Sequence, residues 1–590
     1  MQHSLRSLPF CTRGTAPLCN DTQFQFYPIL GGYDMAWYDE AVFYHIYPLG
    51  MTGAPKQNAY EAPVSRLKTL TPWISHIKNL GFNALYIGPL FESVGHGYET
   101  TDYKKLDSRL GTNHDLSEFV ADCHAQGIRV VFDGVFNHTG RDFFAFEDIR
   151  KNKEASPYRD WYCNVNFYGN NEYNDGFSYD NWGGYNLLAK LNQHNPAVRD
   201  YICDVIRFWV TEFDVDGIRL DAADVLDFSY MQALRKTANE VKPDFWLMGE
   251  VIHGDYNRWV NENTLHAVTN YQLHKALYSG HNDHNYFEIA HTVKRLYEMG
   301  GNKPDGLKLY NFVDNHDVER IYTKLTKKQH FVPVHILLYT LPGIPSVYYG
   351  SEFAIEGVKQ KGSDDSLRPA IDIPTFIEDA KLNSYAKLIG ALGQIRTQSH
   401  ALSYGHYKEL LLTNRQYAFS RDDVIVTVNN DDHDASLNLP AQNGEYTGAL
   451  SHRKILVTDG RLIVSVQGNS GEIWIPSAHS VSADTPLDLI SDSKIEKIQP
   501  IPEKAPEAPG QEALPIAEQT PAPQTQNPIE TPVTTAAENK PYEAMTIEEL
   551  QLCILGKMKK NGPVTERMAQ DVYENTHHGS LVTWAKSFRQ

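Results

Sequence analysis

The sequence predicts an α/β protein whose largest part is a (β/α)8 TIM barrel, and three observations support this fold class. Eight short runs rich in β-branched and aromatic residues occur between residues 41 and 350. Most of them are separated by segments with the 3.6-residue period of a helix. The runs are apolar without strict alternation, which is typical of parallel strands covered on both faces.

The expected strands cover residues 41–48, 84–91, 129–136, 216–223, 245–251, 265–270, 307–313 and 344–350. The clearest helical segments between them cover residues 66–80, 114–127, 197–213 and 230–241. An open doubly wound sheet would also show this alternation, but no glycine-rich phosphate loop follows the first run. The barrel is therefore the preferred interpretation.

The connection after the third strand is too long for a simple loop. We expect residues 139–194 to form a subdomain inserted into a barrel of residues 37–390. This stretch is rich in tyrosine, phenylalanine and tryptophan. The simplest interpretation is that most of these aromatic side chains form the core of the insertion.

The regions that flank the barrel differ in character. Residues 1–36 show no clear period and are expected to be an N-terminal arm. Residues 391–482 contain short strand-like runs separated by turn-rich segments, which predicts a C-terminal antiparallel β-sandwich domain.

The remaining C-terminal sequence is expected to have two parts. Residues 483–541 are punctuated by proline and form a disordered linker. Residues 542–590 are expected to be a small helical module, because Thr546 and Glu549 make a capping box before an amphipathic segment. A protein partner or self-association is the simplest role for this module.

Composition excludes several classes of protein. Hydrophobic residues make up 41% and charged residues 22% of the 590 residues, as in ordinary globular proteins. A net charge of -19 argues against nucleic acid and against an anionic membrane surface as partners. The N-terminus lacks the apolar core of a signal peptide, no stretch reads as a membrane span, and the six cysteines are scattered. We therefore expect a reduced, cytoplasmic, soluble protein.

Polar residues follow several of the predicted strands, at the barrel face where active sites lie. They are Asp133, Asn137 and His138 after strand three, Arg219 and Asp221 after strand four, Glu250 after strand five, and Asp314, Asn315, His316 and Asp317 after strand seven. A single acid at such a position is usually a turn or cap residue. Carboxylates at three separate strand ends are harder to explain in that way and indicate a catalytic cluster.

The spacing of these acids suggests a division of roles. Arg219 and Asp221 are two residues apart on a strand, so both side chains point the same way and Arg219 favours an ionised Asp221. Glu250 has apolar neighbours in the sequence, which favours its protonated form. An ionised nucleophile and a protonated acid about 5–5.5 Å apart are what a retaining glycosidase requires. In this interpretation Asp317, His138 and His316 would bind hydroxyls of the same sugar.

These segments resemble the four main sequence regions of the α-amylase family, glycoside hydrolase family 13. The matching segments are DGVFNH (133–138), GIRLDAA (217–223), GE (249–250) and FVDNHD (312–317), with HGYETTDY (96–103) and GIPSVYYGSEF (343–353) as further ones. The resemblance covers roughly residues 38–480. LAKLN (188–192) is similar to a segment of the neopullulanase and cyclomaltodextrinase subgroup.

The resemblance implies roles for ten residues. Asp221 would be the nucleophile, Glu250 the acid/base and Asp317 the transition-state stabiliser. The expected substrate-binding residues are Tyr98, Asp102, His138, Arg219, His316, Asp364 and Arg368. The insertion would correspond to the family's B domain and the β domain to its C domain.

We expect no cofactor and no required metal ion. Many α-amylases bind structural calcium through the asparagine that corresponds to Asn137 and a histidine at the position of Val225. The stretch NNEYNDG (170–176) resembles a calcium loop only loosely and lacks its terminal Glu.

The sequence therefore predicts a retaining hydrolase of α-1,4-glucosidic bonds in maltodextrins, cyclodextrins or related oligosaccharides. Two alternatives remain: a 4-α-glucanotransferase that uses the same residues, and a catalytically inactive sugar-binding relative. The second would be expected to lack catalytic carboxylates, and all three are present.

Overall fold

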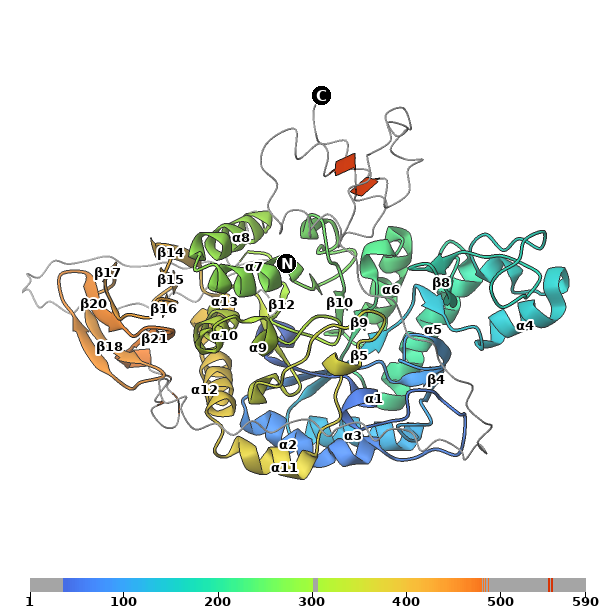
Figure 1. Ribbon diagram of the computed structural model, residues 1–590, viewed down its shortest axis with the longest axis horizontal. Helices are drawn as coiled ribbons and strands as arrows, with labels where there is room; N and C mark the ends of the chain where they lie inside the picture. Colours follow the sequence, from blue (N-terminus) through green and yellow to red (C-terminus); the bar gives the residue numbers. More distant parts are fainter. Residues whose placement is uncertain are drawn as a thin grey trace, which may run out of the picture. The chain divides into compact units, whose positions relative to one another are not determined.

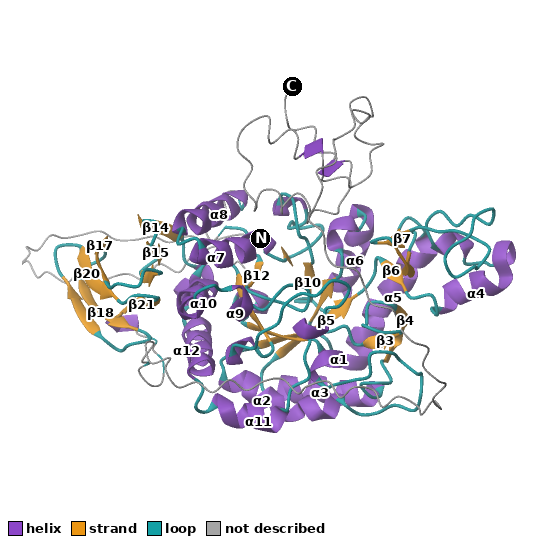
Figure 2. Ribbon diagram, viewed as in Figure 1, coloured by secondary structure: helices purple, strands orange, loops and turns teal. Residues whose placement is uncertain are grey.

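A computed structural model describes residues 36–300, 306–479, 481, 483, 487, 550, 551, 553 and 554. The chain divides into two compact units, Met1–Glu503 and Lys504–Gln590. The barrel, its insertion and the antiparallel sheet all belong to the first unit (Figures 1 and 2).

Eight parallel strands form a nearly closed barrel, as predicted. They are β1 (Phe43–Ile46), β2 (Ala84–Ile87), β5 (Arg129–Gly134), β9 (Gly217–Leu220), β10 (Trp246–Gly249), β11 (Ala267–Val268), β12 (Tyr310–Phe312) and β13 (Ile344–Tyr348). Their order in the sheet is β11-β10-β9-β5-β2-β1-β13-β12. A parallel bridge between Thr269 and Tyr310 joins the two end strands.

Helices surround the strands (Figure 2). They are α1 (Pro48–Met51), α2 (Thr71–Asn79), α3 (Asn113–Ala125), α5 (Pro196–Phe213), α6 (Phe228–Val241), α7 (Tyr271–Asn282), α8 (Tyr286–Met299), α9 (Ile321–Lys324), α10 (Phe331–Thr340), α11 (Ile373–Ala380), α12 (Ser384–Gln398) and α13 (His400–Tyr404). The strand–helix alternation fails once. The fully described stretch between β10 and β11 contains a short 3-10 turn at Tyr256–Arg258, and two helices, α7 and α8, follow β11.

Most barrel strands pack on two cores. On β10, Trp246 and Met248 belong to the core inside the barrel, whereas Leu247 belongs to the core between barrel and helices. Because successive side chains point to opposite faces, both faces of such a strand must be apolar. This explains the uninterrupted apolar runs in the sequence.

The insertion after the third strand contains helix α4 (Phe144–Asn152) and a small antiparallel sheet of β6 (His138–Thr139), β8 (Tyr185–Lys190) and β7 (Asn181–Trp182). Phe146 packs against Tyr162, Phe177 and Tyr179, so much of the aromatic content does form an internal core. A second hairpin, β3 (Phe91–Ser93) and β4 (Thr100–Leu106), follows β2.

An antiparallel β region follows the barrel. Six strands form one sheet in the order β14 (Tyr407–Leu412), β15 (Gln416–Arg421), β16 (Val424–Asn429), β21 (Ser470–Pro476), β18 (Gly444–Gly448) and β19 (Lys454–Val457), and β17 (Ala435–Pro440) pairs with β20 (Arg461–Val466). The two sheets share an apolar core. Helix α10 packs against β16 and β21 (Figure 1). Helix α12 runs through the expected boundary at residues 390 and 391.

Several expectations fall mainly outside the described residues. They are the N-terminal arm (1–36), the linker (483–541) and most of the helical module (542–590). Within the last, Leu550, Gln551, Cys553 and Ile554 are helical, and Leu550 and Ile554 are buried. Among the described helices none qualifies as a membrane span, and the longest, α5, carries several charged side chains.

Buried neutral histidines should make the fold acid-labile. His335 lies in α10 with no exposed surface, and its ring donates from Nδ1 to the carbonyl of Phe331 at 2.8 Å. Burial lowers its pKa to about 4. The unfolded chain therefore binds a proton first as pH falls below about 6.5, so stability is present above that pH and is lost toward pH 4.

Urea titration at pH 7.5 and pH 5 measures how much unfolding free energy is lost on acidification. We expect this loss to be about 2 kcal/mol smaller in His335→Gln than in the wild type. The exposed His291 on α8 provides a control, since His291→Gln should leave the pH dependence unchanged. Equal slopes for His335→Gln and wild type would show that this histidine does not contribute.

Candidate active site

The candidate catalytic residues lie at the carboxyl ends of the barrel strands. Asp133 is on β5, and Asp221 and Glu250 directly follow β9 and β10. On β9, Ile218 and Leu220 pack outward against the helices. Arg219 between them therefore faces the barrel interior, where the acids can meet it.

Arg219 joins the acids of three neighbouring strands. Its Nη1 lies 2.9 Å from Asp133 Oδ1 and 3.0 Å from Asp221 Oδ1, and its Nη2 lies 2.9 Å from Glu250 Oε2. The side chain is 3% exposed. One buried guanidinium thus holds the proposed nucleophile and the proposed acid on the same group.

The surroundings of Glu250 are more polar than the sequence suggested. Besides Arg219, its Oε2 accepts the backbone N–H of Ala222 at 3.2 Å, and its Oε1 accepts the hydroxyl of Tyr271 at 3.2 Å. Ala222 has φ 47° and ψ 42°, a left-handed conformation that is costly for alanine. The apolar setting predicted from the sequence neighbours of Glu250 is therefore wrong.

Asp317 is fixed from both sides. Its Oδ1 lies 2.8 Å from Arg368 Nη2 and its Oδ2 lies 3.1 Å from His316 Nε2. Arg368 also pairs with Asp364 at 3.2 Å and donates from Nε to the carbonyl of His316 at 2.9 Å. The structure therefore brings together His316, Asp317, Asp364 and Arg368.

Tyr98 links this group to Arg219. Its hydroxyl donates to Asp133 Oδ2 at 3.0 Å and also contacts His316 Nε2. The Tyr98 and His316 rings are stacked, with centroids 5.7 Å apart. Four of the expected site residues, Tyr98, Arg219, His316 and Asp317, thus belong to one polar network.

Tyr271 and Asn315 close the network on the other side. Asn315 Nδ2 donates to the Tyr271 hydroxyl at 3.3 Å, and Asn315 Oδ1 accepts the backbone N–H of Asp317 at 2.8 Å. The members of the resulting ring, here called the acid ring, are Asp133, Arg219, Glu250, Tyr271, Asn315, Asp317, His316 and Tyr98, with Asp221 attached through Arg219. It opens to solvent at Asp317, whose side chain is 32% exposed, against 10% for Asp221.

His138 lies beside the acid ring, next to the backbone of Tyr98. Burial lowers its pKa to about 3, so the imidazole is neutral. Its Nδ1 lies 3.2 Å from Asn137 Nδ2, which can donate to it and leave the proton on Nε2. Asp102 is placed differently: it is exposed on β4, accepts the N–H of Lys104 at 2.8 Å, and has no described contact with the acid ring.

Tyr271 is the site residue that the sequence did not indicate. It is the first residue of α7, directly after the weak sixth strand. The signal that could have identified Tyr271 is its position directly after a predicted strand, where the other site residues also lie. Asp133 and Asn315 were also predicted to lie at strand ends, but no separate role was predicted for them.

Burial and charge set the protonation of Asp221. Burial raises its pKa well above the usual range, Arg219 opposes this, and the charge on Glu250 adds to it. The spacing of Arg219 and Asp221 predicted that the guanidinium acts on Asp221. In the structure Arg219 contacts Glu250 as well, so its charge is shared between the two carboxyls.

Asp317 behaves in the opposite way. Burial opposes its ionisation, but His316 and Arg368 outweigh burial and hold its pKa well below the usual range. Asp317 is therefore ionised at neutral pH and accepts hydrogen bonds through both carboxylate oxygens. That suits a group that binds hydroxyls.

The residues corresponding to the family's calcium ligands do not fit a calcium ion. Asn137 Oδ1 accepts a hydrogen bond from Gln193 Nε2 at 3.1 Å, and the side chain of Val225 offers no ligand atom. In the 170–176 stretch, Asp175 is paired with Arg141 through two contacts of 2.7 and 3.0 Å. Its charge is therefore already neutralised.

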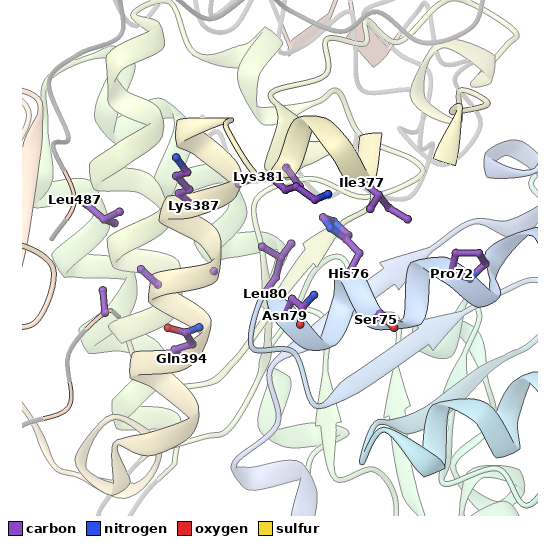
Figure 3. A pocket seen from close by; sticks show the side chains of 15 residues that line it. Pro72, Ser75, His76, Asn79, Leu80, Ile377, Lys381, Lys387, Gln394 and Leu487 are labelled. Carbon is purple, nitrogen blue, oxygen red and sulfur yellow. The ribbon is translucent and has the colours of Figure 1, made fainter. Parts of the chain in front are cut away.

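A separate cavity of about 360 Å³ lies between α2, α11 and α12 (Figure 3). Its polar lining includes Ser75, His76, Asn79 and Lys387. No member of the acid ring lines it. It belongs to the outer helices of the barrel and not to the candidate active site.

Comparison with known proteins identifies the family. The family profile "Alpha amylase, catalytic domain" matches residues 56–384. The chain is 29% identical over 468 residues to a cyclomaltodextrinase of Bacillus sp (74% of this chain, 81% of that one), and 30% identical over 440 residues to a cyclomaltodextrinase of Thermoanaerobacter pseudethanolicus (69% and 74%). A solved cyclomaltodextrinase structure matches with a TM-score of 0.65 at 25% identity, covering 76% of this chain and 81% of that one. With the strand-end acids joined in one ring, these matches show that the chain belongs to the alpha-amylase family of glycoside hydrolases.

Proposed function

We propose that this protein hydrolyses α-1,4-glucosidic bonds in maltodextrins, cyclodextrins or related oligosaccharides, with retention of anomeric configuration. One observation carries the proposal: a single guanidinium, that of Arg219, contacts both Asp221 and Glu250. Retention requires two carboxyl groups about 5–5.5 Å apart, and a shared guanidinium keeps them at short range. The similarity to cyclomaltodextrinases supports this class of substrate.

In the first step Asp221 attacks the anomeric carbon. The bond to the leaving oxygen breaks as Glu250 gives that oxygen its proton, and a glycosyl ester on Asp221 results. This step requires that Glu250 carries a proton and Asp221 carries none when the bond breaks. Tyr271 and the N–H of Ala222 hold the Glu250 carboxyl in place.

In the second step Glu250, now a carboxylate, takes a proton from water. The water oxygen bonds to the anomeric carbon, the ester to Asp221 breaks, and the α-configured product leaves. Asp317, fixed by Arg368 and His316, accepts hydrogen bonds from sugar hydroxyls that strengthen as the ring distorts. Asp221, Glu250 and Asp317 thus act directly on the substrate, whereas Tyr271 and His316 hold two of them in position.

The acid role of Glu250 is tested by Glu250→Gln. We expect turnover of maltotriose to fall about 10²–10⁴-fold, because the leaving oxygen is no longer protonated. A nitrophenyl glycoside should lose much less, since its leaving group needs little protonation. The exposed Glu147 on α4 provides a control, as Glu147→Gln should leave both rates unchanged. Equal losses on the two substrates would contradict the acid role.

A product profile on starch, pullulan, cyclodextrin and maltotriose tests the reaction type. Under excess acceptor a glucanotransferase would form longer chains, whereas the proposed hydrolase yields shorter ones. We also propose a cytoplasmic site of action, supported by four free cysteines, Cys123, Cys163, Cys203 and Cys553, among the described residues.

A further inference from the structure

The hairpin of β7 and β8 carries two aromatic residues at its tip. Trp182 and Tyr185 are cross-strand partners, and Gly183 and Gly184 form the turn between them. Both glycines have positive φ, 63° and 84°, as a type I′ turn requires. Directly opposed residues project to the same face of a hairpin, so the two rings share one face.

The same hairpin reaches the candidate active site. The other end of β8 pairs with β6, where Lys190 lies opposite His138. The Trp182 ring is parallel to the His138 ring, at an angle of 5° and with centroids 6.5 Å apart. The register of the hairpin is irregular: Asn181 pairs with Ala189, whereas the next residue, Trp182, pairs with Tyr185, so β8 bulges between them. The aromatic face therefore begins beside His138 at Trp182 and continues to the exposed ring of Tyr185.

The hairpin is held rigidly, which a binding platform needs. Tyr179 donates its hydroxyl to the carbonyl of Asn186 at 2.6 Å, and Asn181 Nδ2 donates to Asn186 Oδ1 at 2.7 Å. The tip itself stays accessible. Trp182 is half-buried and Tyr185 is 68% exposed.

Packing within the core of the insertion does not explain the Tyr185 ring. Phe146, Tyr162 and Phe177 fill its core, whereas Tyr185 projects from a turn. Exposed aromatic residues that continue from an active site indicate a binding surface, and Trp and Tyr supply large flat contact areas at low entropic cost. Sugar rings present a flat face of C–H groups that such side chains can cover.

We propose that Trp182 and Tyr185 form an aromatic track that binds α-glucan residues beyond the sugar held by the acid ring. This inference rests on the proposed function. Trp182 contacts the glucose nearest to His138, and Tyr185 contacts a glucose further along the chain. The track makes the enzyme favour longer glucan chains over maltotriose.

The test compares maltotriose with maltoheptaose in Trp182→Ala and Tyr185→Ala. Since neither ring touches Asp221 or Glu250, we expect mainly KM to change. KM for maltoheptaose should rise about tenfold for Trp182→Ala, as expected for truncation of a binding aromatic residue. KM for maltotriose should rise less, and Tyr185→Ala should affect maltoheptaose alone. Trp182→Phe retains a flat ring and should restore most of the affinity.

Tyr168 provides the matched control. It is a tyrosine of the same insertion, 98% exposed, and it lies outside the hairpin. Tyr168→Ala should leave both KM values unchanged. Equal effects of Trp182→Ala on the two substrates, or no effect on either, would overturn the track.

A binding measurement separates this inference from the proposed function. In an Asp221→Asn background, calorimetry measures the Kd of maltoheptaose with and without Trp182→Ala. If the wild type hydrolyses no α-glucan but Trp182→Ala still weakens maltoheptaose binding about tenfold, the proposed reaction fails and the track stands. If hydrolysis is observed and this Kd does not change, the track fails and the reaction stands.

Discussion

Asp221→Asn should lower turnover of α-glucans by more than about 10⁴-fold, as expected for loss of a nucleophile, while making the fold more stable at neutral pH. Asparagine keeps the shape of the side chain but cannot form the glycosyl ester. The loss is therefore expected in kcat with every substrate, including nitrophenyl glycosides.

The gain in stability follows from the buried charge. Burial raises the pKa of Asp221 well above its usual range, so the native state holds a proton that the unfolded state releases. The stability that this bound proton contributes is fully present below the unfolded pKa of about 4, and it is lost as the pH rises through the native pKa of Asp221. The asparagine has no such pH-dependent loss.

Asp216 provides a control of opposite sign. It is buried, but burial is outweighed by His124, backbone N–H and Lys242, which lower its pKa to about 2. Asp216→Asn should therefore lower the unfolding midpoint at pH 7, whereas Asp221→Asn should raise it. Wild-type turnover in Asp221→Asn would refute the assignment of the nucleophile, and a lower midpoint would refute the electrostatic argument.

Arg219→Ala should both inactivate and destabilise the protein. It removes a buried cation that contacts Asp133, Asp221 and Glu250 and leaves three acidic side chains in a buried site. Breaking a buried ion pair from one side costs about 3–5 kcal/mol. We expect unfolding free energy at pH 7 to fall by that amount, and kcat/KM to fall by at least about 10²–10³-fold as preorganisation is lost.

The pH dependence identifies the cause of that loss. Without the guanidinium the native carboxyls bind protons more readily than the unfolded chain does, so the deficit relative to wild type should shrink as pH falls from 7 toward 5. Adding Asp133→Asn to the Arg219→Ala variant should also recover part of the lost unfolding free energy.

The control for this variant is Arg396→Ala. Arg396 is equally buried, but it donates to the backbone carbonyls of Tyr339 and Gly343. Its loss should destabilise the protein by an amount that does not depend on pH between 5 and 7. A constant deficit for Arg219→Ala as well would rule out carboxylate repulsion as the cause.

The barrel was predictable because its signals are local. Eight apolar runs and the helical segments between them lie within short windows of sequence, and the strand ends could be located from those runs. Helices were expected between most of the runs, and residues 250–266 are the exception, since no α-helix separates β10 from β11. Tyr271 was missed because the strand before it, β11, has two residues and gives a weak signal.

By itself the sequence determined the chemistry available at the barrel mouth: which acids, histidines and arginines stand at strand ends. Only the tertiary structure decided how they are combined. Arg219 proved to be shared by Asp221 and Glu250, and Glu250 proved to be surrounded by hydrogen-bond donors. Asp102 proved to be exposed on β4. The physical reason is that burial and ion pairing depend on groups brought together from distant parts of the chain, and neighbours in sequence do not report them.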